Sequence, residues 1–358
     1  MHEVHVLPSF GLGGAQTRLC HLINAMPDRR FTIISLSDEL AAATKLARPA
    51  QVEIKRIEAS SSPTFSVFNI ARLRRALCDL KPALVCTYNW GAIEAVIANR
   101  LGPRAPHAHF EDGFGPDEAD GPLRRRGLAR RALLAGNSQL IVASTTLETI
   151  AVKTWGFPDT GVHLLPGGVD TARFAPTDAP PAARPFRIGM VGGLRPEKNI
   201  HRGLRVIARL REEVVLDIVG AGPEDAALRE SASKLGVSAK FFGSVSDPAS
   251  LYRSWHALLL TSDTEQRPFA VLEAMASGLP VVATDVGDIG LMVAPENQPF
   301  IRPVTDEGGL AEALDNLRRQ SELAAHIGAA NRDRAVALFS LERMIEGYRQ
   351  LANRVVEN

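Results

Sequence analysis

The sequence of 358 residues predicts two domains, because most domains have about 100–200 residues. Hydrophobic residues make up 45% of it and charged residues 23%, which is typical of a globular protein with a sizeable core. A formal net charge of +1 excludes an electrostatic argument for nucleic acid, and we expect no such partner. Cys20, Cys78 and Cys86 are scattered and odd in number, which predicts free thiols in a reducing compartment.

The first residues predict a strand rather than a targeting segment. Met1-His-Glu-Val-His-Val has no charged segment followed by an apolar one, as a secretory signal would have. No stretch reaches the roughly 18 apolar residues that are needed to span a bilayer. We therefore expect a cytoplasmic protein.

Short apolar runs alternate with helical segments through both halves of the chain. In the first half the expected strands are residues 4–7, 32–36, 84–87, 107–110 and 139–143, and the expected helices are 15–25, 72–80 and 92–100. In the second half the expected strands are 186–191, 214–219, 240–242, 257–260, 281–283 and 300–302, with helices over 201–211 and 268–276. Repeated strand–helix–strand units predict two doubly wound α/β domains, each with a parallel sheet. Residues 175–185, with four prolines, predict a linker between them.

A glycine-rich turn follows the first strand of the second half. Gly192-Gly193 lead into Arg195 and Lys198, at the start of the expected helix. Glycines let the backbone approach a ligand closely, and a helix N-terminus favours anions. Arg195 and Lys198 can reach one pyrophosphate, Arg as a planar fork and Lys as a point charge. The alternative interpretation is a charged turn on the surface.

Two glutamates, Glu265 and Glu273, lie on either side of another helix start. At the start of that helix we expect three free N–H groups that point to the same anion, those of Phe269, Ala270 and Val271. Glu273 follows apolar neighbours, where a carboxylate is costly without a partner. A ribose diol is a suitable partner, and the alternative is a Glu that caps the helix or reaches solvent.

The segment from Ser262 to Asp285 resembles the signature of glycosyltransferase family 4. It reads Ser, Glu, seven residues and then Glu-Ala-Met-Ala-Ser-Gly-Leu-Pro-Val-Val-Ala-Thr-Asp. Other parts of the family pattern follow in order along nearly the whole chain. They are Gly13-Gly14, residues 166–174, residues 191–199, residues 219–224 and Phe242-Gly243. Five motifs in the family's order make the resemblance specific.

The resemblance implies the GT-B architecture, in which two Rossmann-like domains face a cleft. Residues 1–170 with the last helix, 341–358, would bind the acceptor, and residues 171–340 would bind the nucleotide-sugar. It further implies a hexosyltransferase (EC 2.4) that retains the anomeric configuration and needs neither a cofactor nor a metal. The donor would be a UDP- or GDP-sugar. The acceptor would be a glycan, a lipid-linked sugar or a small molecule, in cell-surface polysaccharide or secondary glycan biosynthesis.

The resemblance also implies a role for each matching residue. Glu265 would be catalytic and hold the hydroxyls of the donor sugar, and Glu273 would anchor the ribose. Arg195 and Lys198 would stabilise the leaving diphosphate in place of a metal ion. The other donor-binding residues would be Gly13, Gly14, Gly193, Gly220, Phe242, Gly243, Arg267, Phe269, Ala270 and Val271.

The chain departs from the family pattern around its first glutamate and after a later glycine. The family commonly has Glu-Gly-Phe where this chain has Glu265-Gln-Arg267. Arg267 either binds a carboxylate or phosphate of a substrate or faces solvent. Relatives often carry a Glu shortly after a Gly pair. The nearest carboxylate here is Asp288, to which we assign no role.

A third departure concerns the acceptor domain. Relatives place a His just before a Gly, near the reacting sugar, whereas this chain has Asp112 before Gly113. A carboxylate can accept the proton of the acceptor hydroxyl. We therefore expect Asp112 or Glu111 to be catalytic, in preference to His109.

Arginines gather in residues 124–131, as Arg124-Arg-Arg126 and Arg130-Arg131. They predict either a solvated helix face or a patch that faces anionic lipid or a phosphorylated acceptor. In the second case the protein would be peripheral on the inner face of the cytoplasmic membrane.

Three other functions compete with the transferase. A sugar-nucleotide epimerase can share the fold but does not explain the pair of Glu265 and Glu273. A nicotinamide-dependent oxidoreductase is disfavoured because neither Gly11–Gly14 nor Gly220–Gly222 has the full GxGxxG spacing. A catalytically inactive nucleotide-binding protein would account for the missing His.

Overall fold

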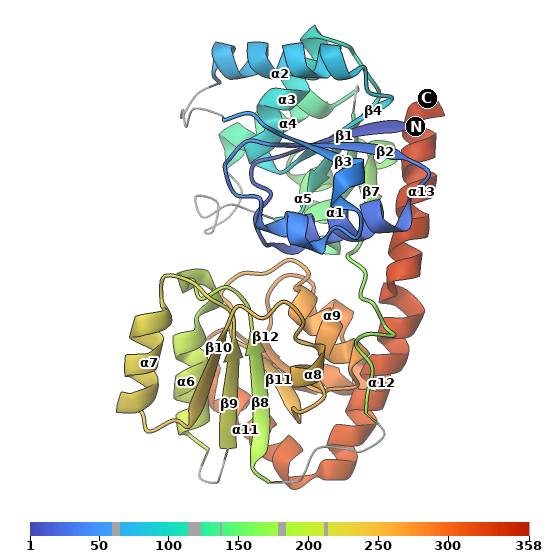
Figure 1. Cartoon of the computed structure of the whole chain (residues 1–358). Coiled ribbons are helices and arrows are strands. Elements are labelled where there is room, and N and C mark those ends of the chain that lie inside the picture. The colour runs from blue at the N-terminus through green and yellow to red at the C-terminus, as the bar shows by residue number, and fades with distance from the viewer. Residues whose placement is uncertain (59–64, 114–122, 137, 178–183, 211–213, 358) are drawn as a thin grey trace. The chain divides into compact units, whose positions relative to one another are not determined.

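The computed structural model describes residues 1–58, 65–113, 123–136, 138–177, 184–210 and 214–357 (Figure 1). The chain forms two compact units. Unit 1 comprises Met1–Gly167 with Glu342–Asn358, and unit 2 comprises Gly168–Leu341. Within the described residues, no helix is both long and apolar enough to cross a bilayer.

Unit 1 contains a parallel seven-stranded sheet with helices on both faces. Its strands are β1 (His2–Leu7), β2 (Arg30–Ser35), β3 (Val52–Arg56), β4 (Leu84–Tyr88), β5 (His107–Glu111), β6 (Gln139–Val142) and β7 (Val162–Leu164). They lie in the order β3-β2-β1-β4-β5-β6-β7. The five expected strands are confirmed. Two were missed, because β3 is a partly polar edge strand and β7 has three residues.

The helices of unit 1 lie between its strands, apart from α13, which follows the last strand of unit 2. They are α1 (Gly14–Ala25), α2 (Val67–Leu80), α3 (Ile93–Leu101), α4 (Arg124–Leu134), α5 (Thr145–Lys153) and α13 (Leu341–Glu357), whose first residue belongs to unit 2. Helix α2 begins five residues before its expected start, because the Ser66 hydroxyl accepts a hydrogen bond from the Asn69 N–H at 3.3 Å and so caps the first turn.

Unit 2 repeats the arrangement with six strands. They are β8 (Phe186–Val191), β9 (Val214–Val219), β10 (Ala239–Gly243), β11 (Ala257–Leu260), β12 (Val281–Thr284) and β13 (Ile301–Arg302), all parallel, in the order β10-β9-β8-β11-β12-β13. The helices are α6 (Ile200–Ala208), α7 (Asp225–Lys234), α8 (Ala249–Tyr252), α9 (Phe269–Ala276), α10 (Ile289–Met292), α11 (Glu307–Arg319) and α12 (Ser321–Phe339). The prediction of two doubly wound domains is confirmed.

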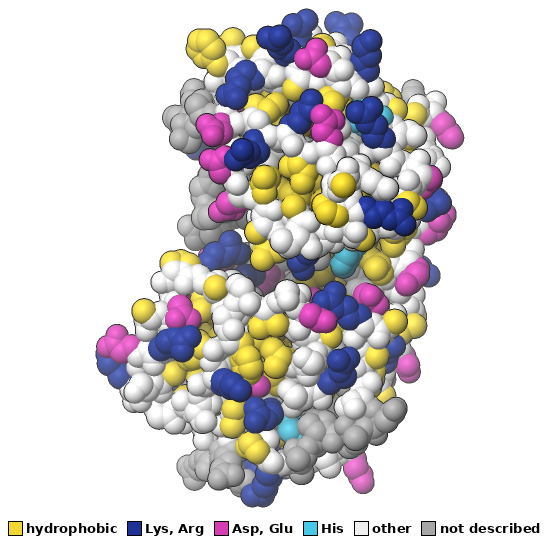
Figure 2. Space-filling model, viewed as in Figure 1, with side chains coloured by type: hydrophobic (Ala, Val, Ile, Leu, Met, Phe, Trp, Pro, Cys, Tyr) yellow, Lys and Arg dark blue, Asp and Glu magenta, His cyan; other side chains and the backbone are white. Residues whose placement is uncertain are grey.

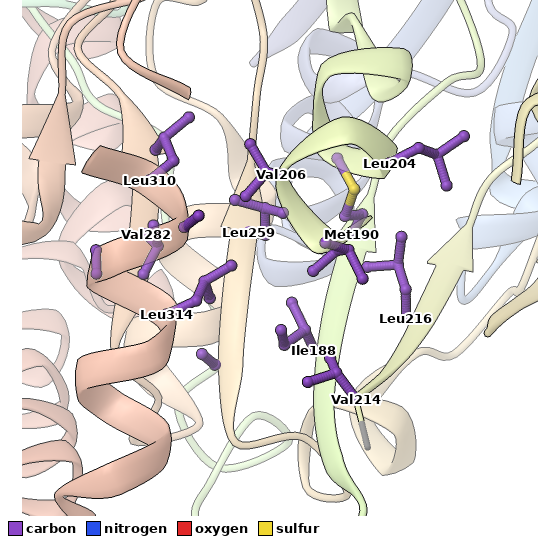
Figure 3. Packing of buried hydrophobic residues seen from close by; sticks show 14 of the residues in the cluster. Ile188, Met190, Leu204, Val206, Val214, Leu216, Leu259, Val282, Leu310 and Leu314 are labelled. Carbon is purple, nitrogen blue, oxygen red and sulfur yellow. The ribbon is translucent and has the colours of Figure 1, made fainter. Parts of the chain in front are cut away.

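One face of the unit 2 sheet packs against α6 and α11. Ile188 and Met190 of β8 and Leu259 of β11 are at most 3% exposed, and in Figure 3 they meet side chains of both helices. Leu204 of α6 and Leu314 of α11 are fully buried in the same cluster. The burial of these apolar side chains fixes the positions at which the strands end, and therefore the site at those ends.

In both units the strand order reverses beside the first strand. The reversal lies between β1 and β4 in unit 1 and between β8 and β11 in unit 2. Loops that leave neighbouring parallel strands there in opposite directions open a crevice at the carboxyl ends, where ligands of such sheets bind. The fold therefore points to the loops after β1, β4, β8 and β11.

Residues 175–185 lie inside unit 2 rather than between the units, and residues 178–183 among them are outside the described part of the chain. Val169 and Phe174 already pack in the core of unit 2. The chain passes between the units twice, at Gly167–Gly168 and at Leu341–Glu342. Beside these crossings Val169 forms hydrogen bonds of 2.9 Å to Phe339 and to Leu341.

A buried polar cluster holds α13 against the sheet of unit 1. Glu3 of β1 is fully buried, and it accepts hydrogen bonds from Tyr348 of α13 and, at 2.6 Å, from Arg29. Burial raises the pKa of Glu3, but hydrogen bonds and charge from His5, Tyr348 and Arg29 outweigh it and hold the pKa below its ordinary value. Glu3 is therefore ionised at neutral pH, and the cluster is stabilising while it stays ionised.

Replacement of Tyr348 by Phe is expected to reduce the free energy of unfolding by about 1–3 kcal/mol, because it removes one donor from a buried carboxylate. Since the pKa of Glu3 is lowered in the folded state, its stabilisation is present at neutral pH and is lost as the pH falls through that lowered value. The difference between wild type and Tyr348→Phe should therefore shrink in acid. Urea denaturation over the range from pH 7 to pH 3 measures it.

Arg349→Ala is the matched control, because Arg349 is exposed on the same helix. Hydrogen exchange should become faster in α13 of Tyr348→Phe and stay unchanged in the control. Equal stability of wild type and Tyr348→Phe at pH 7 would show that the cluster does not hold α13.

Candidate functional site

Two glycine loops of unit 2 contact each other through their backbones. The loop after β8 contains Gly192 and Gly193, and the loop after β9 contains Gly220 and Gly222. A Cβ on Gly220 would lie 1.8 Å from the carbonyl oxygen of Gly192, and Gly220 has φ +145°, which side chains rarely adopt. The N–H of Gly220 also donates to the carbonyl of Gly243, after β10, at 2.8 Å. Gly193, Gly220 and Gly243 are thus brought together at the carboxyl ends of β8, β9 and β10.

Lys198 and Glu265 form an ion pair at the reversal of strand order in unit 2. The Lys198 Nζ lies 2.5 Å from Oε1 of Glu265, which also accepts from the Ser262 hydroxyl at 2.8 Å. The side chains of Lys198 and Glu265 are 21% and 10% exposed. Arg195 is more open and pairs with Glu197 at 3.0 Å. Both expected phosphate-binding cations are therefore present, each with a carboxylate partner.

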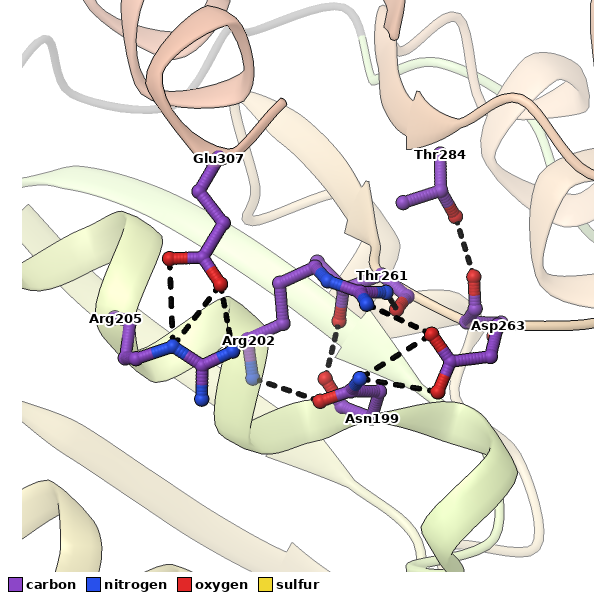
Figure 4. Close-up of polar contacts among 8 residues, drawn as sticks. Asn199, Arg202, Arg205, Thr261, Asp263, Thr284 and Glu307 are labelled. Carbon is purple, nitrogen blue, oxygen red and sulfur yellow. Dashed lines mark hydrogen bonds and ion pairs between the residues drawn. The ribbon is translucent and has the colours of Figure 1, made fainter. Parts of the chain in front are cut away.

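A hydrogen-bond network that the sequence did not reveal joins the two loops that carry this pair, and Figure 4 shows the network. Asn199 adopts a left-handed conformation and caps α6, accepting from the Arg202 N–H at 3.2 Å. Its amide donates to both oxygens of Asp263, at 3.0 and 3.2 Å, and Arg202 pairs with the same carboxylate at 2.8 Å. Because Asp263 follows β11 and Asn199 follows β8, the network ties the loop of Glu265 to that of Lys198.

Helix α9 begins at the same edge of the sheet with two free donors rather than three. Phe269 and Ala270 open the helix, and no backbone acceptor for their N–H groups occurs in the described part of the chain. The Val271 N–H already donates to the Pro268 carbonyl at 3.1 Å, because the first turn is tight. Val271 therefore does not supply the donor expected of it.

Glu273 has a protein partner that the sequence did not indicate. The hydroxyl of Tyr252, a fully buried residue of α8, donates to Oε2 of Glu273 at 2.7 Å. Burial, together with the negative charge of Glu273, raises the pKa of Tyr252 well above its ordinary value, so it stays a donor. Phe242, which the sequence also predicts to bind the donor, lies near the end of β10. The Lys240 ammonium lies over its ring, 4.7 Å from the ring centre.

Arg267 does not face solvent, so that interpretation was wrong. Its side chain is 9% exposed, and its Nε lies 3.3 Å from Oδ2 of the fully buried Asp288. Asp288, which has no role in the sequence pattern, is thus the counter-charge of Arg267. The reason is tertiary: Gly287, at φ +57°, lies so close to Glu265 that a Cβ would come within 2.2 Å of its carbonyl oxygen.

In unit 1, Asp112 lies at the carboxyl end of β5 and is held by α1. Arg18 of α1 is 3% exposed and pairs with both carboxylate oxygens, at 2.5 and 2.9 Å. The Asp112 N–H donates to Asn89, in the loop after β4, at 2.7 Å. Burial raises the pKa of Asp112, and Arg18 opposes that shift.

Gly13 and Gly14 begin α1 in the same unit, so the structure places them in unit 1 and the other expected donor-binding residues in unit 2.

Glu111 and His109 are fully buried, in contrast to Asp112, which is 16% exposed. Glu111 accepts from Arg130 of α4 at 2.9 Å. His109 shares the Thr87 hydroxyl with His107, at 2.7 and 2.9 Å. These hydrogen bonds are typical of core polar residues.

The basic segment 124–131 is not one solvated or lipid-facing surface. Arg130 is 1% exposed and lies over the rings of Trp90 and Trp155, at 5.2 and 4.6 Å. Arg124, Arg125 and Arg131 stay exposed. Arg130 is therefore not part of the predicted basic patch of residues 124–131, because it forms a buried ion pair with Glu111.

The described residues contain one group with the spacing of metal ligands, Glu3, His5 and Cys86, in the core of unit 1. Glu3 already accepts from Arg29 and Tyr348, and His5 Nδ1 lies 2.9 Å from the Tyr88 hydroxyl. All three cysteines are free thiols, as predicted. The cluster is accounted for by hydrogen bonds, and it lies apart from the residues at the strand ends.

Two family models match successive parts of the chain. Residues 13–168 match the glycosyl transferase 4-like domain, and residues 176–334 match the glycosyl transferases group 1. The GDP-mannose-dependent alpha-mannosyltransferase of Mycobacterium tuberculosis is 30% identical over 286 residues, which cover 74% of this chain and 71% of the relative. The chain belongs to the group 1 glycosyltransferases.

Further relatives and solved structures agree with this assignment. The lipopolysaccharide core biosynthesis glycosyltransferase LpsE of Rhizobium meliloti is 25% identical, and the match covers 95% of each chain. The crystal structure of Anabaena HepE in complex with UDP has a TM-score of 0.83 at 18% identity and covers 99% of this chain and 100% of its own. Sucrose-phosphate synthase of Thermosynechococcus elongatus has a TM-score of 0.81 at 18% identity, with 99% of each chain covered.

These similarities confirm the predicted family and the GT-B fold. This group 1 glycosyltransferase is a hexosyltransferase that uses a nucleotide-sugar. The epimerase alternative is not favoured, since the similar proteins named above are transferases or synthases.

Replacement of Gly220 by Ala is expected to abolish binding of UDP and GDP, because the new Cβ would push the two glycine loops apart. Gly236→Ala is the matched control. Gly236 also has positive φ, +65°, but a Cβ added there would have no atom of the described residues within 4 Å, so only the roughly 1 kcal/mol conformational cost applies. Nucleotide titration and thermal melting measure both variants. Normal nucleotide binding by Gly220→Ala would contradict the proposed role of this backbone contact.

Proposed function

We propose that this glycosyltransferase transfers a hexose from a UDP- or GDP-sugar, with retention and without a metal ion, to a glycan or lipid-linked acceptor. The observation that supports it most is the Lys198–Glu265 ion pair, which joins the loops after β8 and β11, where the strand order reverses. A phosphate group beside Lys198 and a sugar beside Glu265 would be adjacent, as they are in a nucleotide-sugar.

Departure of the nucleoside diphosphate places growing negative charge on the leaving phosphate. Enzymes stabilise such charge with donors that are already positioned. Lys198, Arg195 and the first N–H groups of α9 are such donors, and together they replace the charge that a divalent ion supplies in other transferases. Glu265 then faces the positive charge that develops at the sugar carbon, where a carboxylate is favourable.

Asp112 is the preferred acceptor-side residue. It is partly exposed, whereas Glu111 and His109 are fully buried. Its raised pKa makes it a better proton acceptor than an ordinary carboxylate, because the strength of a base increases with its pKa. Arg18 fixes the direction of the carboxylate.

The proposal leaves the nucleotide open between UDP and GDP, because the similar proteins differ. One relative is GDP-mannose-dependent, and the Anabaena structure holds UDP. For the acceptor, one relative acts in lipopolysaccharide core biosynthesis and another on a phosphatidylinositol monomannoside. Both acceptors are glycans on a lipid, which supports a role in cell-surface glycan synthesis.

Calorimetric titration of UDP, GDP and ADP, each with and without EDTA, tests the donor site. We expect one nucleotide to bind at micromolar affinity. Its binding should be unchanged in the presence of EDTA, because in this proposal no metal takes part. Glu273→Gln should reduce the affinity for that nucleotide about tenfold, since about 1.4 kcal/mol of hydrogen bonding to the ribose would be lost.

Tyr252→Phe is the control for a purely structural effect, because it removes the protein partner of Glu273 and keeps the carboxylate. It should weaken the nucleotide less than Glu273→Gln does. Loss of binding with EDTA would overturn metal independence, and no binding of any of the three nucleotides would overturn the donor site.

A lipid-linked acceptor requires a surface that meets the membrane, and we propose that unit 1 supplies it. Val67 and Phe68 open α2 and are 77% and 84% exposed, and α2 then carries three exposed arginines, Arg72, Arg74 and Arg75. Figure 2 shows hydrophobic side chains where this helix begins and basic ones along it. Apolar groups beside arginines suit an anionic bilayer. We place the protein at the inner face of the cytoplasmic membrane.

The same surface continues to α4 through Trp90. The rings of Phe65 and Trp90 lie 6.3 Å apart, and the Arg126 guanidinium lies 5.1 Å from the Trp90 ring. Arg124 and Arg125 are exposed at the start of α4. The proposed membrane surface therefore includes both helices.

The double variant Val67→Ser/Phe68→Ser is expected to reduce binding to phosphatidylglycerol vesicles at least about fivefold, because two exposed apolar side chains are lost. Val336→Ser/Leu338→Ser on α12 removes two side chains that are each 43% exposed, in unit 2, and should bind as wild type does. Vesicle sedimentation at low and high salt measures the effect. Wild-type protein that does not sediment at low salt would contradict membrane association.

A further inference from the structure

The turn that carries Lys198 is anchored on both sides to the loop after β11. Before it, the carbonyl of Glu197 accepts a hydrogen bond from the Asp263 N–H at 2.9 Å. After it, the carbonyl of Asn199 accepts one from the Thr261 hydroxyl, also at 2.9 Å. Lys198 lies between these two anchors, in a turn that ends at Asn199 with a left-handed backbone. The direction of the Lys198 side chain therefore depends on where this loop lies.

Arg202, in the first turn of α6, holds the same loop through its guanidinium (Figure 4). Its Nη1 donates to the Thr261 carbonyl at 2.8 Å, and its Nη2 lies 2.8 Å from Oδ1 of Asp263. Ser262 lies between these two contacts, and its hydroxyl donates to Oε1 of Glu265 at 2.8 Å. Arg202 thus fixes the short stretch from which Glu265 receives a hydrogen bond.

The guanidinium of Arg202 is turned toward the protein. Its side chain is 11% exposed, whereas that of Asp263 is 44% exposed. A planar guanidinium holds two acceptors in one fixed geometry, whereas an ammonium is a point charge on a flexible stem. The charge of Arg202 also acts on Glu307, whose ion pairs are with Arg205 and Arg209, at 2.6 and 3.6 Å. The two fixed acceptors of Arg202 therefore belong to the loop after β11.

The position of Lys198 decides which phosphate it meets. Lys198 lies 2.5 Å from Glu265, which the proposed donor site places beside the sugar. In a nucleotide-sugar of this kind the sugar is bonded to the β-phosphate, so Lys198 meets the β-phosphate. A displacement of about 1 Å at such a group can cost about 100-fold in rate, because the charge then lies away from the leaving oxygen.

We propose that Arg202 is a positioning residue of the donor site, which holds Lys198 at the β-phosphate of the nucleotide-sugar by way of Thr261 and Asp263. This rests on the proposed donor site, in which Lys198 stabilises the leaving diphosphate. It goes beyond that site by assigning a role to a side chain that does not touch the substrate. Without Arg202 the two loops would separate, and the contact of Lys198 with the β-phosphate would weaken while the contacts with the rest of the nucleotide remain.

Calorimetric titration of a nucleoside diphosphate and of the monophosphate with the same base isolates the β-phosphate. The probes are UDP and UMP, or GDP and GMP where the guanosine nucleotide binds. Wild type should bind the diphosphate at least about tenfold more tightly, and Lys198→Met should remove most of that preference. Arg202→Met should reduce the preference at least about fivefold and leave the affinity for the monophosphate within about twofold of wild type.

Arg205→Met is the matched control. Arg205 lies one turn further along α6 and pairs with Glu307 rather than with the loop after β11, so its loss should leave the preference unchanged (Figure 4). Arg202→Lys keeps the charge but not the planar fork, and it should give an intermediate preference. Asp263→Ala removes the more exposed partner and should lower the preference as Arg202→Met does, so the test does not depend on the folding of one variant.

A double variant separates action through Lys198 from a direct effect. Because Arg202 acts through Lys198, the variant Lys198→Met/Arg202→Met should have the same preference as Lys198→Met alone. A further loss of preference in the double variant would mean that Arg202 acts by itself, and would overturn the proposal.

The remaining outcomes distinguish the donor site from the role of Arg202. Absence of nucleotide binding in the wild type, or a wild-type preference in Lys198→Met, is a failure of the donor site as proposed, and of this inference with it. A normal effect of Lys198→Met together with an unchanged preference in Arg202→Met and Asp263→Ala overturns the role of Arg202 alone. Equal weakening of both nucleotides in Arg202→Met would show a merely structural role and would overturn it as well.

Discussion

The backbone contact between Gly192 and Gly220 is the constraint on which the candidate donor site depends. Only hydrogen atoms fit between the two loops, since a Cβ would lie 1.8 Å from a carbonyl oxygen. The contact lets the loop after β8 continue close to the sheet and turn into Asn199, which starts α6. Lys198 is thereby held beside Glu265. A bulkier residue at Gly220 would displace the cation from the carboxylate that it orients.

Charge compensation is the second theme of both units. Four buried or half-buried basic side chains near the strand ends each have an opposite charge within ion-pair distance. The pairs are Lys198–Glu265, Arg267–Asp288, Arg18–Asp112 and Arg130–Glu111. Such pairs add little to stability, because desolvation offsets their attraction, but they hold side chains in fixed directions. The arrangement suits catalysis, in which donors must be oriented before charge develops.

The use of polar groups in the core differs from their use at the strand ends. Glu3, His5, Tyr88 and Tyr348 satisfy one another inside unit 1, and Tyr348 comes from α13 at the far end of the chain. Their hydrogen bonds hold α13 in one position on the sheet. An apolar helix face alone would allow α13 to pack in more than one register. The metal-like spacing of Glu3, His5 and Cys86 follows from this packing.

The sequence by itself determined the two sheets and the residues at their carboxyl ends. Apolar runs marked eleven of the thirteen strands in the described part of the chain, and the spacing of Gly193, Lys198 and Glu265 predicted a phosphate-binding edge on the second sheet. These features are local, since a strand or a glycine turn is encoded within a few residues. The partners of the charged residues are not local. Only the tertiary structure decided that Arg267 meets Asp288 and that Arg130 lies buried against Glu111, because the two residues of each pair belong to different segments, whose packing no short pattern encodes.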